Sequence, residues 1–153
     1  MSKASFVIDE LEKKDNIYII KEFNGNSKFD HNYNTIYWNP HRILLTTTGY
    51  VLTSAELLSH EADHTVSYDE DSKSAISRRN TQDSVYGNKE EKRVIEGSEQ
   101  AVAIKLNRVL ECGTTRTDHF GTGCYYVNSP DSDEYECITI TVDKNKLQNI
   151  TPQ

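Results

Sequence analysis

Long apolar runs are missing from this chain, in which hydrophobic residues make up only 35% of 153 positions. The opening residues, Met-Ser-Lys-Ala-Ser, lack the apolar core of a secretory signal peptide. No later segment approaches the roughly 20 consecutive apolar residues that a membrane-spanning helix needs. We therefore expect synthesis in the cytoplasm without a signal peptide, and no membrane span. The low apolar content also predicts long polar loops.

Cysteine is scarce, and Cys112, Cys124 and Cys137 all lie in the last third of the chain. An odd number of cysteines in a chain without a leader favours free thiols, although a Cys124–Cys137 bridge across a hairpin stays open. Their spacing is wide and contains no CxxC pair. This spacing argues against a zinc site built from cysteines.

Positive charge is also in deficit, since 17 Lys and Arg residues face 24 Asp and Glu residues, which gives a net charge of −7. A phosphate backbone attracts a basic surface, so this balance argues against a nucleic-acid partner. The length predicts a single domain, residues 1–153, which can bury a core without cross-links. We expect this domain to be a monomer.

The sequence predicts a helix that contains an HExxH motif. Thr53-Ser54-Ala55-Glu56 matches a capping box, in which the side chains of the first and fourth residues bond each other's backbone amides. Apolar residues at 57, 58, 62 and 66 continue the pattern, and we expect the helix to end near Tyr68. The pentapeptide His-Glu-Ala-Asp-His, residues 60–64, lies in the middle of this helix.

Helical geometry places His60 and His64 on one face, because positions i and i+4 lie one turn apart. Two imidazoles so placed can bind one Zn²⁺ ion. Glu61 then lies beside the metal, where its carboxylate can act as a general base on a water molecule. Asp63 departs from the pattern, since it puts a charge where peptidases of this type have an uncharged residue.

A catalytic zinc site needs a third protein ligand. The metzincin pattern would place a glycine and a histidine at positions that hold Ser67 and Glu70 here, so that class is excluded. The alternative is a glutamate from a following helix. The candidates all lie on the second predicted helix: Glu90, Glu91, Glu96 and Glu99.

The remaining elements predict an α+β fold. Short β-rich runs at residues 6–8, 17–20 and 35–38, with a fourth strand around Gly49-Tyr50, predict a small antiparallel sheet in the first third. The polar segment 69–88 shows no apolar periodicity and is expected to be a long loop.

The second helix is expected to run from about Lys89 to Leu110. Gly97 interrupts it, and Cys112-Gly113 is the expected stop. Two further β-like runs follow, at residues 124–127 and 136–142, with a turn between them.

Three segments resemble the NleD-like effector zinc metallopeptidases, similar domains of which end many bacterial polymorphic (Rhs-type) toxins. These segments are LSHEADH at 58–64, YGNKEEKRVIEGSE at 86–99 and RTDH at 116–119. The resemblance covers about residues 34–130. It implies a compact zincin-like domain with a small antiparallel sheet, an HExxH helix and a second helix that supplies a glutamate ligand.

The resemblance also implies roles for particular residues. The third zinc ligand would come from the Glu-Glu-x-x-Val-Ile segment, as Glu91 with Glu90 as the alternative. His119 and Arg116 are candidates to stabilise the oxyanion that forms during peptide hydrolysis. Tyr125 or Tyr126 could serve instead. Independently of the resemblance, ligating imidazoles need hydrogen-bond partners that orient them, and Glu99 and Asp63 are the candidates.

The function expected from these residues is a zinc-dependent endopeptidase that acts as a bacterial effector or toxin. It would be delivered by a specialised secretion system and would cleave a protein in a target cell, with a cognate immunity protein as a further partner. The alternative is a non-catalytic zinc-binding module, which would have no use for Glu61. A nuclease or deaminase toxin with a zinc site is disfavoured, because the chain is acidic and lacks the His-x-Glu and Pro-Cys-x-x-Cys pattern of zinc deaminases.

Overall fold

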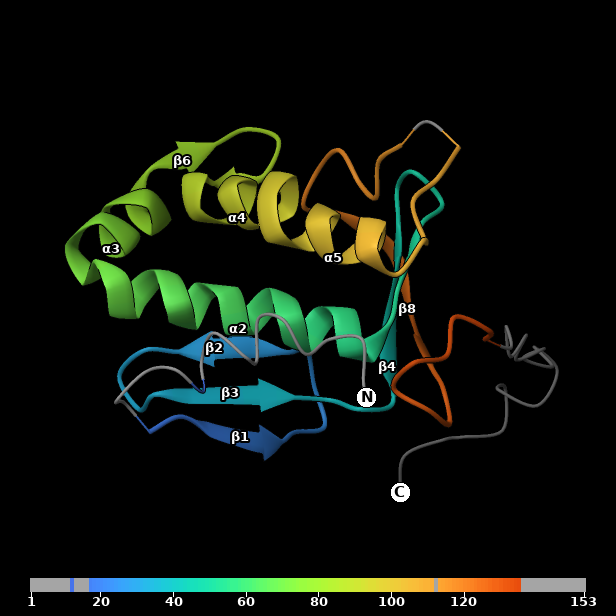
Figure 1. The fold of residues 1–153 in the computed structure, drawn as a ribbon, viewed down its shortest axis with the longest axis horizontal. Coiled ribbons are helices and arrows are strands. Elements are labelled where there is room, and N and C mark those ends of the chain that lie inside the picture. The colour runs from blue at the N-terminus through green and yellow to red at the C-terminus, as the bar shows by residue number, and fades with distance from the viewer. Residues whose placement is uncertain (1–11, 13–16, 112, 136–153) are drawn as a thin grey trace, which may run out of the picture.

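The computed structural model describes residues 12, 17–111 and 113–135, and it confirms the α+β class (Figure 1). A three-stranded sheet lies beneath the central helix α2, and a second helical segment lies above it. A second three-stranded sheet stands across the N-terminal end of α2. The elements of these layers are β1 (Ile19–Glu22), β2 (Lys28–Asp30), β3 (Thr35–Trp38), β4 (Arg42–Thr46), β5 (Val51–Leu52), α2 (Ser54–Glu70), α3 (Ser72–Asn80), β6 (Gln82–Asp83), β7 (Gly87–Asn88), α4 (Lys89–Val94), η1 (Ile95–Glu99), α5 (Gln100–Lys105) and β8 (Gly121–Tyr126).

The expectation of one antiparallel sheet in the first third is only partly met. In the first sheet, of order β1-β3-β2, β2 runs antiparallel to β3 but β1 runs parallel to it. The expected strand around Gly49-Tyr50 is instead a turn that joins β4 to β5, with Gly49 at a positive φ of 83° that glycine adopts without strain. β4 pairs on its other edge with β8, which contains most of the expected run 124–127. The second sheet therefore joins segments about 80 residues apart.

The capping box that begins α2 is present as the sequence predicts. The Glu56 backbone amide donates to the Thr53 hydroxyl, and the Thr53 amide donates to the Glu56 carboxylate. The buried Tyr50 hydroxyl also donates to Glu56. Leu58, Ala62 and Val66 pack with the first sheet, because they share the helix face turned towards it. The helix that carries HExxH is thus fixed at its start and along one side.

The segment 69–88 is not the expected loop. It contains helix α3 and the short hairpin β6–β7. α3 lacks apolar periodicity because only Ala75 of its residues is buried. The Asp71 side chain caps it by accepting from the Ser74 amide.

The second helix begins at Lys89 as expected, but it ends at Lys105 rather than at Leu110. Asn107 adopts a left-handed φ of 54°, and two reverse hydrogen bonds close the end, from Asn107 N to Ile104 O and from Arg108 N to Ala103 O. This is the geometry of a Schellman motif, which asparagine tolerates better than most residues.

Some expectations lie outside the described residues: the strands at 6–8 and 136–142, and the thiols of Cys112 and Cys137. Cys124 is a free and exposed thiol. Across the described part of the chain, each helix is too short or too polar to cross a lipid bilayer.

Candidate metal centre

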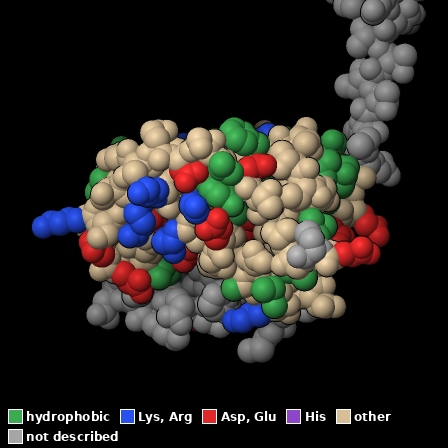
Figure 2. Space-filling view, turned by 90° about the horizontal axis from the view of Figure 1, so that it is seen from above, with side chains coloured by type: hydrophobic (Ala, Val, Ile, Leu, Met, Phe, Trp, Pro, Cys, Tyr) green, Lys and Arg blue, Asp and Glu red, His purple; other side chains and the backbone are tan. Residues whose placement is uncertain are grey.

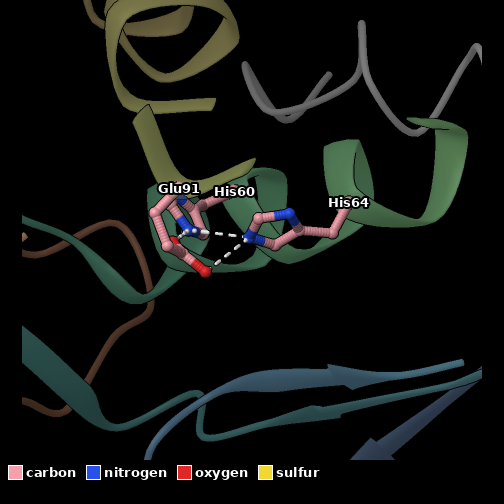
Figure 3. A group of neighbouring side chains, drawn as sticks. All are labelled: His60, His64 and Glu91. Atoms are coloured by element: carbon pink, nitrogen blue, oxygen red, sulfur yellow. Dashed lines mark hydrogen bonds and ion pairs between the residues drawn. The ribbon is translucent and has the colours of Figure 1, made fainter. Parts of the chain in front are cut away.

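Three side chains from two helices converge at the centre of the molecule. Figure 3 shows the imidazoles of His60 and His64, both from α2, and the carboxylate of Glu91, from α4, pointing towards one another. His60 Nε2 lies 3.1 Å from Glu91 Oε2, and His64 Nε2 lies 3.3 Å from Glu91 Oε1. The two Nε2 atoms are 3.2 Å apart. These three residues can therefore hold one metal ion.

The spacing of the donor groups suits a small metal ion. Ligand atoms placed tetrahedrally at 2.0–2.1 Å from an ion are separated by about 3.3 Å. The two Nε2 atoms, 3.2 Å apart, have this spacing, and each lies at a similar distance from one Glu91 oxygen: His60 from Oε2 at 3.1 Å and His64 from Oε1 at 3.3 Å. An ion held by the two imidazoles and one carboxylate would have a fourth position for a water molecule or a substrate oxygen.

A buried carboxylate and an arginine hold the His60 ring from behind. His60 Nδ1 lies 2.9 Å from Glu99 Oε2, and Arg116 donates to both oxygens of Glu99 at 2.9 and 2.7 Å. Glu99 and Arg116 are buried, with side-chain exposures of 1% and 3%. A carboxylate that accepts from Nδ1 leaves the lone pair of Nε2 facing the metal position. This contact matches the expectation that Glu99 orients an imidazole.

A π-helical turn brings Glu91 and Glu99 to the same histidine. Glu91 and Glu99 are eight positions apart. In a regular α-helix, side chains at this spacing point in directions that differ by about 80°. The π turn η1, which contains Gly97, accommodates one extra residue in the helix. Glu91 and Glu99 are therefore oriented like residues seven positions apart in an α-helix, whose directions differ by only about 20°. The interruption expected at Gly97 is thus a π turn, which changes the direction of the side chains that follow it.

His64 is held in a similar way by Glu90. His64 Nδ1 lies 3.5 Å from Glu90 Oε1, and this carboxylate also binds Arg93 at 2.8 Å and Arg78 at 2.5 Å. Arg78 reaches Glu90 from α3, and its Nη2 donates to the hydroxyl of Ser67. The structure therefore places Glu91 towards the Nε2 atoms and Glu90 behind one of the rings. Asn88 caps α4 by accepting from both glutamate amides, which fixes the two carboxylates in their different directions.

The candidate general base, Glu61, lies at the border between α2 and the first sheet. Its Oε2 accepts from the backbone N–H of Phe29 in β2, at 2.8 Å. Its other oxygen makes no hydrogen bond within the described residues, and the side chain lines the same cleft as the metal group. The carboxylate is thus oriented through one oxygen while the other can accept a proton.

The remaining site residues differ in how they face the cleft. His119 Nε2 lies 3.3 Å from Glu91 Oε2, and its side chain is 45% exposed, so it can donate to a bound ligand. Arg116 lines the cleft, but two of its N–H groups donate to Glu99. Because Glu99 contacts His60, Arg116 is a positioning residue for that histidine. Tyr125 stacks on Tyr135, and Tyr126 is exposed, with its hydroxyl 3.5 Å from Asn24.

Asp63, the unusual residue of the motif, has a structural role. Its Oδ2 accepts from Arg93 at 2.9 Å and from the Ser98 hydroxyl at 2.8 Å. Asp63 therefore connects α2 to α4 and η1. Within the described residues it contacts neither ligating imidazole, so the structure does not support the expectation that it orients one.

A cleft of about 500 Å³ opens over these side chains. Its lining comes from β2, β4, α2, α3 and α4, together with the segment around His119. A cleft of this size accommodates a few residues of an extended peptide or a small ligand.

No family model, curated protein or solved structure matches this chain. The likeness to the NleD-like peptidases therefore stays a prediction from the three quoted segments.

The charges of the site depend on one another. Burial alone would lower the pKa of His60, but hydrogen bonds to Glu91 and Glu99 raise it to about 10. The pKa of His64 is raised against burial by hydrogen bonds to Glu90 and Glu91. Burial opposes ionisation of Glu91, but bonds from His119, His60 and His64 hold its pKa far below its usual range. Without a metal, the site therefore keeps protons on its imidazoles and negative charge on its carboxylates.

Sequence reasoning missed the two arginines that hold Glu90 and the amide that orients Glu61. Arg78 lies in the segment expected to be a loop, so no partner could be assigned to it. The Asp71 cap with Ser74 three residues later was the available signal for α3. The contact from Phe29 joins residues 32 positions apart through a backbone amide, which leaves no trace in residue type.

Proposed function

We propose that this protein is a zinc-dependent endopeptidase of the NleD-like effector type. The observation that carries the proposal is the triangle of two Nε2 atoms and one carboxylate, with a second carboxylate, Glu61, beside it. Two imidazoles and one carboxylate are the ligand set of gluzincin-type catalytic zinc sites, and they suit Zn²⁺ better than Mg²⁺ or Ca²⁺. The quoted segments support a zincin-like fold and delivery into a target cell.

The residues around the zinc position divide the work of peptide hydrolysis. Zinc held by His60, His64 and Glu91 would act as a Lewis acid that polarises the scissile carbonyl and makes a water molecule more acidic. Glu61 takes a proton from that water and passes it to the leaving amine. His119, at the exposed edge of the site, donates to the carbonyl oxygen as it gains charge. Glu99 and Glu90 keep the histidine rings in their ligating orientation.

The deciding experiment compares new protein N-termini in lysates of candidate target cells treated with zinc-loaded wild type or Glu61→Gln. We expect a defined set of cleavages with wild type alone. Equal cleavage by both proteins would rule out the proposed mechanism. Zinc binding without cleavage in any lysate would favour the non-catalytic zinc-binding module.

The ligand assignment predicts different effects for two neighbouring glutamates. Glu91→Gln removes a direct ligand, and we expect its zinc affinity to fall more than 100-fold. Glu90→Gln weakens only the support behind His64, for which the expected loss is about 10- to 100-fold. Competition with a chromophoric zinc chelator measures both affinities. A larger loss in Glu90→Gln than in Glu91→Gln would contradict the assignment.

Zinc affinity should rise with pH, because metal and protons compete for the same imidazole nitrogens. The folded pKa of His60, about 10, lies above its ordinary value of 6.5. Its contribution to the stability of the metal-free protein is therefore complete below pH 6.5 and is lost as pH rises towards 10. Between pH 6.5 and 8.5 we expect the metal-free protein to lose stability while the stabilisation by zinc grows. Thermal unfolding with and without chelator measures both trends, and a pH-independent zinc effect would contradict them.

A further inference from the structure

Basic side chains outnumber acidic ones in the lining of the cleft, whereas the chain as a whole is acidic. Acidic residues outnumber basic ones by 24 to 17 in the whole sequence. The only carboxylates in the described lining of the cleft are Glu61 and Glu91, both of which belong to the proposed zinc site. The cations that line it are more numerous: Lys28, Arg42, Arg79 and Arg116. A concave surface of one sign attracts ligands of the opposite sign.

Two of these cations have no carboxylate partner among the described residues. Arg116 is bound to Glu99, and the Lys28 ammonium lies 5.3 Å from the centre of the Tyr37 ring. The Nε of Arg42, by contrast, is buried without a hydrogen-bond partner. The side-chain bond recorded for Arg79 joins Nη1 to His31 Nδ1 at 3.4 Å. Leaving a guanidinium donor buried and unpaired is costly, so an anionic group bound beside Arg42 would be stabilised there.

Several cations outside the cleft lining have carboxylate partners, in contrast to Arg42 and Arg79. Seen from above, Lys and Arg side chains gather over the α3–α4 end of the molecule, with Asp and Glu side chains among them (Figure 2). Arg78, Arg93 and Lys92 each lie within 4 Å of a carboxylate. Among the described residues, the arginines without a carboxylate partner are therefore the two that line the cleft.

Arg42 and Arg79 lie towards opposite ends of α2. The Arg42 carbonyl accepts from the hydroxyl of Ser54, the first residue of the helix. Arg79 contacts His31, whose ring lies 5.2 Å from that of Tyr68 near the end of the helix. The segment from Ser54 to Tyr68 is about 21 Å long at 1.5 Å per residue. The residues of the proposed zinc site lie between these two points.

We propose that Arg42 and Arg79 select substrates with anionic side chains on both sides of the scissile bond. This inference rests on the proposed peptidase function. An extended peptide advances about 3.3 Å per residue, so a 21 Å span corresponds to about six residues. The anionic side chains would lie within about three residues of the bond, one on each side. Aspartate, glutamate and phosphorylated residues share the chemistry that a guanidinium binds.

The test uses fluorescent ten-residue peptides of one backbone sequence, with glutamine, glutamate or phosphoserine at one position on each side of the central bond. Binding to zinc-loaded Glu61→Gln is followed by anisotropy, and cleavage by zinc-loaded wild type is followed by chromatography. We expect each anionic residue to tighten binding about 10-fold, the effect of one charge-assisted hydrogen-bond pair. The glutamate and phosphoserine series distinguish the two sources of the charge.

Protein variants assign the effect to the two arginines. Arg42→Gln and Arg79→Gln should each abolish the preference at one side only and leave the other intact. Lys73→Gln removes the same charge from α3 outside the cleft lining and should change neither preference. The peptide series tests the effect of substrate charge with both arginines in place. The inference can therefore be tested even if one of the arginine variants fails to fold.

The outcomes separate this inference from the proposed function. Cleavage that ignores peptide charge would uphold the peptidase and overturn the role of the arginines. Tight binding of anionic peptides that are never cleaved would uphold the anionic cleft and overturn the peptidase. Absence of binding to any peptide, or equally tight binding of a single-stranded oligonucleotide of matched charge, would overturn the inference.

Discussion

Replacement of Glu61 by glutamine is expected to lower kcat/KM for peptide cleavage by about 10²- to 10⁴-fold, the range that a positioned general base contributes. Zinc affinity should not change, because the ligand triangle consists of His60, His64 and Glu91. The fold should also survive, because the glutamine carbonyl can accept the same hydrogen bond from the Phe29 amide. The variant thus removes proton transfer alone.

Glu96→Gln is the matched control for this substitution. Glu96 is 53% exposed on η1, and its recorded ion pair is with Lys92 at 3.9 Å, so its loss should leave kcat/KM within twofold of wild type. Zinc content, measured by mass spectrometry of the purified proteins, should be one ion per chain in all three. A Glu61→Gln protein that retains full activity, or that loses its zinc, would overturn the role given to Glu61.

Replacement of Arg116 by methionine is expected to destabilise the protein by about 3–5 kcal/mol, the cost of leaving one buried charge without its partner. Arg116 makes two hydrogen bonds to Glu99, and both side chains are almost fully inaccessible to solvent. Burial raises the pKa of Glu99, and hydrogen bonds and charge interactions with His60 and Arg116 lower it; with Arg116 gone, only the contact with His60 remains to oppose burial. Chemical denaturation of the metal-free protein measures this cost.

A double variant distinguishes loss of the charge pair from simple loss of packing. Glu99→Gln combined with Arg116→Met removes both charges, and we expect it to be more stable than Arg116→Met alone. Zinc binding by the double variant should still be about 10- to 100-fold weaker than wild type, because the support behind His60 is weakened. Lys73→Met, which removes an exposed cation, should change stability little. If the double variant is less stable than Arg116→Met, the buried pair does not explain the effect.

The elements that the sequence predicts best are those whose determinants are local. The capping box at Thr53 and Glu56 and the apolar positions that follow it predict α2 to within two residues of its end at Glu70. Helical periodicity alone then brings His60 and His64 together. The local sequence pattern does not distinguish Glu91 from Glu90 as the third metal ligand. Both glutamates lie in the first turn of α4 and differ only in the direction of their side chains.

The elements that sequence reasoning missed depend on distant contacts. Helix α3 buries a single residue, so its amphipathic signal is absent, and the Arg78–Glu90 ion pair helps to hold it. The parallel pairing of β1 with β3 and the pairing of β4 with β8 depend on the path of the whole chain. The role of Asp63 became visible only with Arg93 and Ser98, 30 and 35 positions away, placed beside it.

The π turn at η1 has a consequence for recognising other chains built in this way. In a regular helix, two side chains that serve the same histidine would lie seven positions apart, whereas here they lie at 91 and 99. An HExxH helix followed by two glutamates at a spacing of eight, with a glycine between them, is therefore the signature that this geometry leaves in a sequence. Such a pattern can identify related sites even where the rest of the chain has diverged beyond alignment.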